Sequence, residues 1–237
     1  MMNNKFAIFI LTHGRPDNVL TIKTIVDSGY TGDWYLIVDN EDKRLDEYVA
    51  NFSHHRVIVF DKKAMADKID EANNFDNRKV IVHARNYCFT AAKNLGLTHF
   101  LQLDDDYTSF RYRYIDSYIT KGSVKAMDKV IASMIRFFDA SDFHSIAFAQ
   151  GGDFIGGACC HLLSNYQYGA RKCMNSFFCS TKRPFQFVGS INEDVNTYTS
   201  LAAKGLKFMT IPFIGLEQAA TQSQAGGMTD AYLAAGT

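Results

Sequence analysis

The sequence has no hydrophobic run of membrane-spanning length and no secretory signal. Its longest plainly apolar stretch is residues 6–11, whereas a transmembrane helix needs about 20 apolar residues. The first residues do not show a charged segment, an apolar run and a small-residue cleavage site in that order, so no signal peptide is expected. These absences exclude an integral membrane protein and predict a cytoplasmic protein without a membrane partner.

Cysteine is scarce, and the five cysteines form no CxxC pair. Their odd number favours free thiols over a disulfide framework. The residues that raise the question of zinc are Cys159, Cys160, His161, Cys173 and Cys179. Structural zinc sites use two short ligand pairs, and adjacent cysteines rarely hold one ion with tetrahedral geometry. Buried thiols are therefore the favoured interpretation.

The sequence does contain enough apolar material for a substantial core, at 47% hydrophobic and 14% aromatic residues. Apolar segments typical of buried strands lie at 5–11, 34–38, 56–60 and 99–103, and helical spacing of apolar residues is found at 19–26, 45–52 and 82–95. Asp17 is a candidate cap for the first helix and Gly96 for the end of the third. This alternation predicts an α/β fold with a mostly parallel sheet flanked by helices. No repeat or linker is visible, so we expect a single domain over 1–237.

Polar residues follow each predicted strand. Thr12 to Asp17 follows the first, Asp39 the second, Asp61 the third and the segment 104–106 the fourth. Because the carboxyl ends of parallel strands meet at one edge of a sheet, ligands bind at that edge. Neither GxGxxG after the first strand nor GxxxxGK[ST] occurs. The polar residues at this edge are therefore explained neither by a dinucleotide site nor by a Walker loop.

The three consecutive acids Asp104, Asp105 and Asp106 carry the strongest chemical signal. In an extended segment alternate residues point to the same side, so Asp104 and Asp106 can face one cation while Asp105 faces elsewhere. Carboxylate oxygens suit Mg²⁺ or Mn²⁺, which keep waters and bridge to phosphate oxygens. A solvated acidic turn is the alternative. Three like charges behind an apolar strand repel one another without a cation, however, which favours a metal and a bound diphosphate.

The order of these motifs resembles the nucleotide-sugar half of GT-A glycosyltransferases. The motifs are Thr12-His13-Gly14-Arg15-Pro16-Asp17, then Asp39, then Ala84-Arg85-Asn86 at a helix start, then Leu101-Gln102-Leu103-Asp104-Asp105-Asp106. Further along, Ile191-Asn192-Glu193-Asp194-Val195 is similar to the segment in which many members place a catalytic or acceptor-binding carboxylate. The resemblance implies a nucleotide-sugar-binding half at 1–106 and an acceptor-binding half at 107–237.

The resemblance also implies a role for individual residues. Those implied to bind the nucleotide sugar are Thr12, Arg15, Asp39, Arg85 and Asp105. Asp104 and Asp106 would hold Mn²⁺ or Mg²⁺, which neutralises charge on the leaving diphosphate. Asp194, with Glu193 as the other candidate, would take the proton from the acceptor hydroxyl. The alternatives are that the two arginines are surface or ion-pair residues, and that the acidic pair only caps the next helix.

One feature departs from the GT-A pattern. Many metal-dependent members add a histidine ligand near the C-terminal end of the domain, but the last histidine of this sequence is His161. The third ligand is then water, another side chain, or a residue of a missing C-terminal piece. The polar, glycine-bearing stretch 221–228 is a candidate to fold over a bound nucleotide.

The acceptor half contains a segment rich in basic and aromatic residues, with no acidic residue between His161 and Glu193. Its cations are Arg171, Lys172, Lys182 and Arg183, and its aromatics are Tyr166, Tyr168, Phe177, Phe178, Phe185 and Phe187. A second such segment lies at 110–114. Cations that neutralise phosphates and rings that stack on bases suit a nucleic-acid acceptor. The alternative is a core of aromatics with a cationic rim, and the formal net charge of +0 argues mildly against tight, non-specific DNA binding.

The C-terminal part of the sequence resembles one particular family of glycosyltransferases. Residues 217–232, which include Ser223-Gln224-Ala225-Gly226-Gly227-Met228, are similar to the TET-associated glycosyltransferases of phages, a family associated with adding sugars to 5-hydroxymethylcytosine in DNA. The resemblance implies UDP-glucose as a plausible donor and DNA with a hydroxymethylated base as the acceptor.

Three other functions stay open at this point. The first is a glycosyltransferase with a glycan or protein acceptor. The second is a nucleotidyltransferase, which also uses acids and a metal but usually begins with a glycine-rich, basic loop, whereas His13-Gly14-Arg15-Pro16 has one glycine. The third is a non-catalytic module that binds nucleotides or DNA.

Overall fold

A computed structural model describes residues 5–68, 81–113, 120–155, 172–190 and 192–219. In these residues one sheet runs through both halves of the chain, in the strand order β3-β2-β1-β4-β8-β7-β9-β5-β6. The strands are β1 (Phe6–Leu11), β2 (Asp33–Asp39), β3 (Val57–Phe60), β4 (His99–Asp104), β5 (Tyr107–Arg113), β6 (Thr120–Ser123), β7 (Ser145–Gln150), β8 (Phe177–Ser180) and β9 (Phe208–Gln218). The division of function at residue 106 stays a prediction.

The first four strands confirm the sequence prediction. Strands β3, β2, β1 and β4 pair with one another in parallel. Their apolar runs are continuous because both faces of this part of the sheet are covered: Ile8 and Ile10 of β1 pack in one core cluster, and Phe9 and Leu11 pack in the other. All four strands therefore end at the same edge, where the polar residues follow.

The second half of the sheet is mixed. Strand β8 is antiparallel to both β4 and β7, β9 is parallel to β7, and β5 is antiparallel to β9 and β6. The α/β architecture is confirmed, with parallel pairing concentrated in β1–β4. Strand β4 is thus the last strand of the parallel group, and the acidic triplet lies where the sheet changes its pairing.

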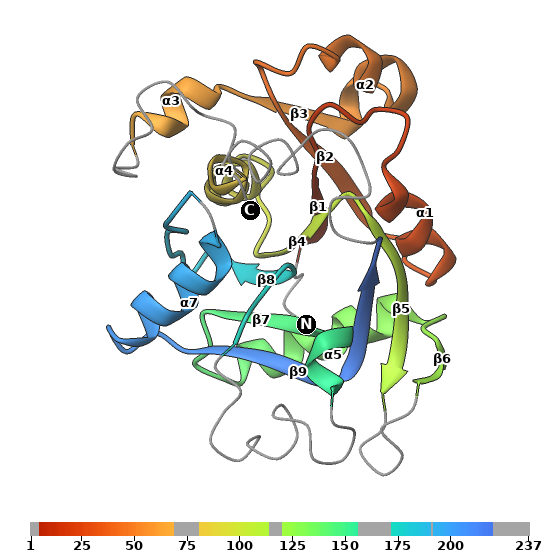
Figure 1. The fold of residues 1–237 in the computed structure, drawn as a ribbon, viewed down its shortest axis with the longest axis vertical. Helices are drawn as coiled ribbons and strands as arrows, with labels where there is room; N and C mark the ends of the chain where they lie inside the picture. Colours follow the sequence, from red (N-terminus) through yellow and green to blue (C-terminus); the bar gives the residue numbers. More distant parts are fainter. Residues whose placement is uncertain (1–4, 69–80, 114–119, 156–171, 191, 220–237) are drawn as a thin grey trace.

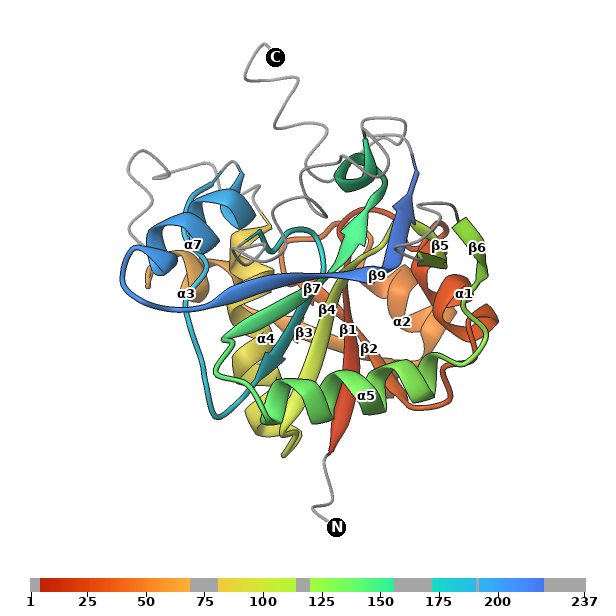
Figure 2. The same cartoon turned by 90° about the horizontal axis from the view of Figure 1, so that it is seen from below.

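Helices cover both faces of the sheet (Figures 1 and 2). On one face lie α1 (Leu20–Asp27), α2 (Leu45–Phe52) and α5 (Met127–Asp139); on the other lie α3 (Lys62–Ala66), α4 (Val82–Asn94) and α7 (Glu193–Ala202). Figure 2 shows α5 crossing the strands on its face. The short 3₁₀ helices η1 (His54–Arg56) and η2 (Gly151–Phe154) complete the described elements. Within the described ranges, no helix has the length and apolar character needed to cross a membrane.

Two helix ends test the predicted caps. Helix α4 is followed by Gly96 with φ of +65°, a conformation that favours glycine, as predicted. The prediction that Asp17 caps α1 is wrong. The helix begins at Leu20 with Val19 at the N-cap position and no side-chain cap, because a turn closed by Asn18 N and the Arg15 carbonyl at 3.0 Å separates Asp17 from the helix.

The cysteines in the described residues are buried free thiols. Cys88, Cys173 and Cys179 have 0% exposure, and burial raises their pKa values. Residues 159–161 of the considered zinc group lie outside the described residues.

Candidate active site

The acidic triplet begins with Asp104, the last residue of β4. Its carboxylate accepts hydrogen bonds from Arg85 Nη2 at 3.1 Å and from the Tyr107 hydroxyl at 3.3 Å. Burial raises the pKa of Asp104 to about 7; the charge of Arg85 opposes this rise, and the charge of Asp106 adds to it. Additional positive charge beside Asp104 would therefore favour its ionised form.

Asp105 points away from this carboxylate, as the alternation predicted. The register between β1 and β4 pairs Leu11 with Asp104 and so places Thr12 beside Asp105. The Asp105 carboxylate accepts hydrogen bonds from Thr12 Oγ1 at 2.7 Å and from Arg15 Nη1 at 3.0 Å. These contacts join the loop after β1 to the triplet, so three of the residues predicted to bind the nucleotide sugar bind each other.

Asp106 is partly buried and follows in the turn before β5. Burial raises its pKa to about 6, and the neighbouring charge of Asp105 adds to the rise. Its carbonyl accepts a hydrogen bond from Ala219 N at 3.0 Å, which ties the turn to the end of β9.

The two elevated pKa values test whether Asp104 and Asp106 fit a divalent ion. Both carboxyls resist ionisation because they are buried near other acids, and a cation would remove that penalty. Among the described residues no group of three His, Cys, Asp or Glu side chains is arranged to hold a metal ion. Mg²⁺ commonly takes one or two carboxylates and completes its shell with water and substrate phosphates. The residues present fit an ion of this kind.

The second acidic pair lies at the start of α7, after Asn192, whose φ of +53° turns the chain into the helix. Glu193 accepts a hydrogen bond from Arg85 Nε at 2.8 Å. Asp194 is 6% exposed and its carboxylate accepts the Val195 amide at 2.7 Å. Burial raises the pKa of Asp194, and the charge of Glu193 adds to the rise. A carboxylate with a raised pKa accepts a proton more readily, which suits a general base.

Arg85 lies between the acidic triplet at the end of β4 and the acidic pair Glu193 and Asp194 at the start of α7. It is 1% exposed, and its Nη2 and Nε groups donate to Asp104 and Glu193, not to an open surface. This geometry agrees with the ion-pair alternative for Arg85. Its role as a diphosphate ligand stays a prediction that the contacts do not favour.

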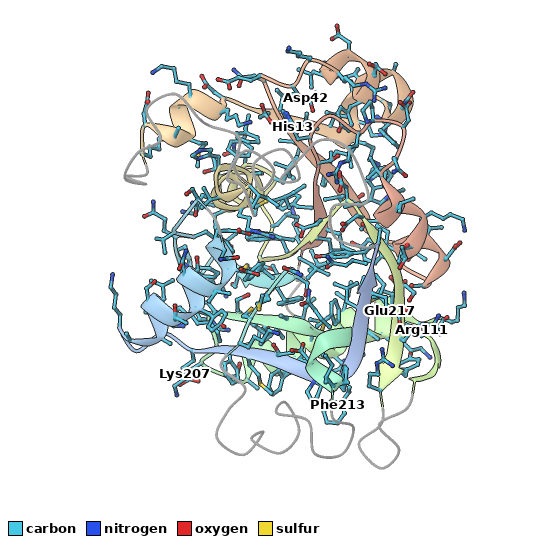
Figure 3. The ribbon with its side chains drawn as sticks, viewed as in Figure 1. His13, Asp42, Arg111, Lys207, Phe213 and Glu217 are labelled. Carbon is cyan, nitrogen blue, oxygen red and sulfur yellow. The ribbon has the colours of Figure 1, made fainter. Side chains whose placement is uncertain are left out.

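Asp39 is surrounded by residues that the sequence analysis did not single out. It accepts a hydrogen bond from His13 Nδ1 at 2.7 Å and pairs with Lys62 Nζ at 3.3 Å. Asp42 accepts the Gly14 amide at 2.7 Å, and Figure 3 shows it close to His13. Burial opposes ionisation of Asp39, but the contacts with His13 and Lys62 outweigh it and lower its pKa. The sequence offered one signal for these contacts. His13 follows the first predicted strand and Asp42 follows the second, and the ends of neighbouring parallel strands lie close together.

Of the predicted acceptor-binding cations, the three in the described residues do not come together. Arg171 lies outside the described residues. Lys172 pairs with Asp153 at 2.6 Å, so a carboxylate more distant in sequence neutralises it. Of the aromatics in the same segment, Phe177, Phe178 and Phe187 have 0% exposure, which agrees with the alternative of a core.

Lys182 and Arg183 lie at the other edge of the sheet. The preceding residue, Thr181, donates its amide to the Thr98 carbonyl, just before β4 begins, whereas Asp104 ends that strand about 20 Å away. Arg183 donates to the carbonyls of Phe138, Ser141 and Phe143 at 2.7–2.8 Å and stacks on the Phe138 ring at 4.0 Å. Arg183 therefore binds carbonyls at the end of α5 and just after it, and the acceptor-binding role of this pair stays a prediction that these contacts do not favour.

Arg183→Ala is expected to lower the free energy of unfolding by about 1–3 kcal/mol, because it leaves carbonyls at the end of α5 without a charged donor. Chemical denaturation measures this change. Lys182→Ala, at the exposed neighbour, is the matched control and is expected to stay within about 0.5 kcal/mol of the wild type. Equal stability of the two variants would contradict the assigned role of Arg183.

Comparison with known proteins gives the class of this α/β protein. The family model described as "TET-Associated Glycosyltransferase" matches residues 6–227. The chain is a glycosyltransferase. It belongs to the TET-associated glycosyltransferase family, and the predicted enzyme class and GT-A-like α/β architecture are confirmed. A search of curated proteins found no match.

Solved structures with similar folds include glucosyl-3-phosphoglycerate synthase from Mycobacterium tuberculosis in complex with Mg²⁺ and UDP. Its identity is 9% and its TM-score 0.49, with 92% of this chain and 72% of that chain covered. A complex of the same synthase with Mn²⁺, UDP-glucose and glycerol 3-phosphate has 11% identity and a TM-score of 0.49, over 97% and 76% of the two chains. A putative nucleotide-diphospho-sugar transferase from Desulfovibrio desulfuricans G20 has 6% identity and a TM-score of 0.49, over 92% and 84%.

Proposed function

We propose that this enzyme transfers a sugar from a nucleotide diphosphate sugar, with UDP-glucose as the favoured donor, to the hydroxymethyl group of 5-hydroxymethylcytosine in DNA. The observation that carries the proposal is that acidic residues from two distant parts of the chain bind the same arginine. Asp104 at the end of β4 and Glu193 at the start of α7 share one buried arginine. Such a site can hold a charged donor and a proton acceptor side by side.

The donor side of the site contains the residues for a metal and a nucleoside. Asp104 and Asp106 would hold Mn²⁺ or Mg²⁺, and the bound ion supplies positive charge that stabilises the leaving diphosphate. Thr12 and Arg15 keep Asp105 turned away from the ion. Asp39, held ionised by His13 and Lys62, offers a fixed polar group for the nucleoside.

The acceptor side depends on Asp194. Its buried carboxylate is the candidate base that removes the proton from the attacking hydroxyl. Glu193 accepts a hydrogen bond from Arg85 Nε at 2.8 Å, so Asp194 is the better candidate for the general base. Burial of the pair also keeps bulk water away from the base and so favours transfer over hydrolysis of the donor.

The proposal of a DNA acceptor is supported by the family match and not by a basic surface. Figure 3 shows Arg111 of β5 beside Glu217 of β9, and these groups pair at 2.9 Å, as Lys172 pairs with Asp153. A hydroxymethylated base inside a duplex would have to be extruded to reach the buried carboxylates. A cytoplasmic place of action, in the host if a phage encodes the chain, stays a prediction.

The test is incubation of the protein with Mn²⁺, one of several nucleotide sugars, and oligonucleotides that differ only in cytosine, 5-methylcytosine or 5-hydroxymethylcytosine. Mass spectrometry is expected to show one added hexose on the hydroxymethylated strand alone, and a chelator is expected to stop the reaction. Glycan and protein acceptors are assayed in parallel. Transfer to one of those acceptors and not to DNA would overturn the acceptor, and release of pyrophosphate from a nucleoside triphosphate plus a sugar phosphate would indicate a nucleotidyltransferase.

A further inference from the structure

Arg85 is a buried arginine whose two carboxylate partners belong to different parts of the site. Nη2 donates to Asp104 at 3.1 Å, and Nε donates to Glu193 at 2.8 Å. The guanidinium carbon lies 4.9 Å from the Phe177 ring centroid and 5.9 Å from that of Phe187. The fork and the flanking rings leave the group little freedom to move.

The backbone around Arg85 is fixed in the same way. Gln102 of β4 donates its side-chain amide to the Arg85 carbonyl at 3.0 Å. The next residue, Asn86, exchanges two hydrogen bonds with the backbone of Phe187, at 2.8 and 3.0 Å. The first turn of α4 is therefore attached both to the strand that ends in the triplet and to the segment that leads into α7.

The hydrogen bonding of Arg85 is incomplete. Its Nη1 is buried and has no hydrogen-bond partner among the described residues. A buried donor without a partner costs free energy, so an arginine placed only for stability would be expected to satisfy it. The unpaired Nη1 instead indicates that the contacts with Asp104 and Glu193 determine where the guanidinium lies.

We propose that Arg85 is a positioning residue that sets the separation between Asp104 on the donor side and the start of α7 on the acceptor side. Glu193 is its anchor on α7, and Asp194 is held in place by this anchor. The proposal rests on the proposed function for the roles of Asp104 and Asp194, but the contacts themselves do not depend on it. Lysine carries the same charge as arginine but has a single ammonium group, which cannot span both carboxylates with the fork geometry.

Arg85→Lys is expected to lower kcat for transfer by about 10- to 100-fold, with KM for the donor within about threefold of the wild type, because misplacement of the base costs rate while the charge beside Asp104 remains. Hydrogen exchange of the free protein is expected to be faster in residues 192–197 and unchanged in β1 and β2.

Arg56→Lys is the matched control. Arg56 also stacks on a ring, at 5.0 Å from the Trp34 centroid, and donates to the Trp34 carbonyl at 3.0 Å, but it contacts neither Asp104 nor Glu193. The control is expected to keep wild-type kcat and wild-type exchange in residues 192–197.

Glu193→Gln tests the anchor if Arg85→Lys fails to fold. It is expected to reproduce the kcat loss and the faster exchange, and the double variant is expected to lose less than the product of the two single losses. Wild-type kcat together with wild-type exchange in both variants would overturn the proposal. If the wild-type enzyme transfers no sugar from any donor, the proposed function fails, while the exchange of residues 192–197 in the variants still decides whether Arg85 positions α7.

Discussion

Asp106→Asn is expected to lower transfer about a thousandfold or more, because it removes one of the two carboxylates that would hold the metal and so the charge that stabilises the leaving diphosphate. The fold is expected to tolerate the change. Burial already raises the pKa of Asp106 to about 6, so the folded chain gains nothing from its negative charge. The measurement is kcat over KM with Mn²⁺ and donor, together with the thermal midpoint of each protein.

Asp61→Asn is the matched control for this prediction. Asp61 also lies at the carboxyl edge of the sheet, but it is exposed and accepts the Ala64 amide at 2.9 Å as the cap of α3. Asparagine caps helices as well as aspartate does, so activity and stability are expected to stay unchanged. Near-wild-type activity of the Asp106 variant would show that the triplet is not a metal site.

Asp194→Asn is expected to lower transfer by about 10²- to 10⁴-fold, which is the usual contribution of a general base. Binding of UDP in the presence of Mn²⁺ is expected to change by less than about threefold, because the donor phosphates are bound on the other side of the site. Calorimetry measures the binding, and a discontinuous assay of labelled DNA measures the transfer. Equal loss of binding and transfer would point to a structural role for Asp194.

Asp46→Asn is the matched control for Asp194. Both residues lie in the first turn of a helix, where a negative charge interacts favourably with the helix dipole. If capping were the only role of Asp194, the two variants would have similar small effects on stability, and neither would affect transfer. A loss of transfer confined to Asp194→Asn separates the chemical role from the capping role.

The parallel half of the fold could be predicted because its signals are local. Strands β1 and β4 are apolar runs that end at a polar turn or at acids, and they are buried on both faces. The antiparallel half lacks such signals. Strand β8 is only Phe177–Ser180, and the buried residues of β5, Tyr107 and Phe110, lie three apart without a strand-like alternation. The pairing is therefore set by distant partners, β4 for β8 and β9 for β5.

The site could be predicted as far as the strand ends define it. The positions of Asp104, Asp105 and Asp106 follow from strand geometry, and the acids of α7 follow from the family resemblance. The roles of the arginines do not follow from the sequence, because a guanidinium takes its role from what surrounds it. Arg85 meets Glu193 only after α7 folds against α4, and Arg183 meets the end of α5 only after β8 pairs with β4.

The continuity of the sheet restricts how one half of it can move against the other. Backbone hydrogen bonds join β4 to β8 and β8 to β7, so the parallel strands and the strands that follow them form one continuous sheet in the described residues. Rotation of one half against the other would break these ladders.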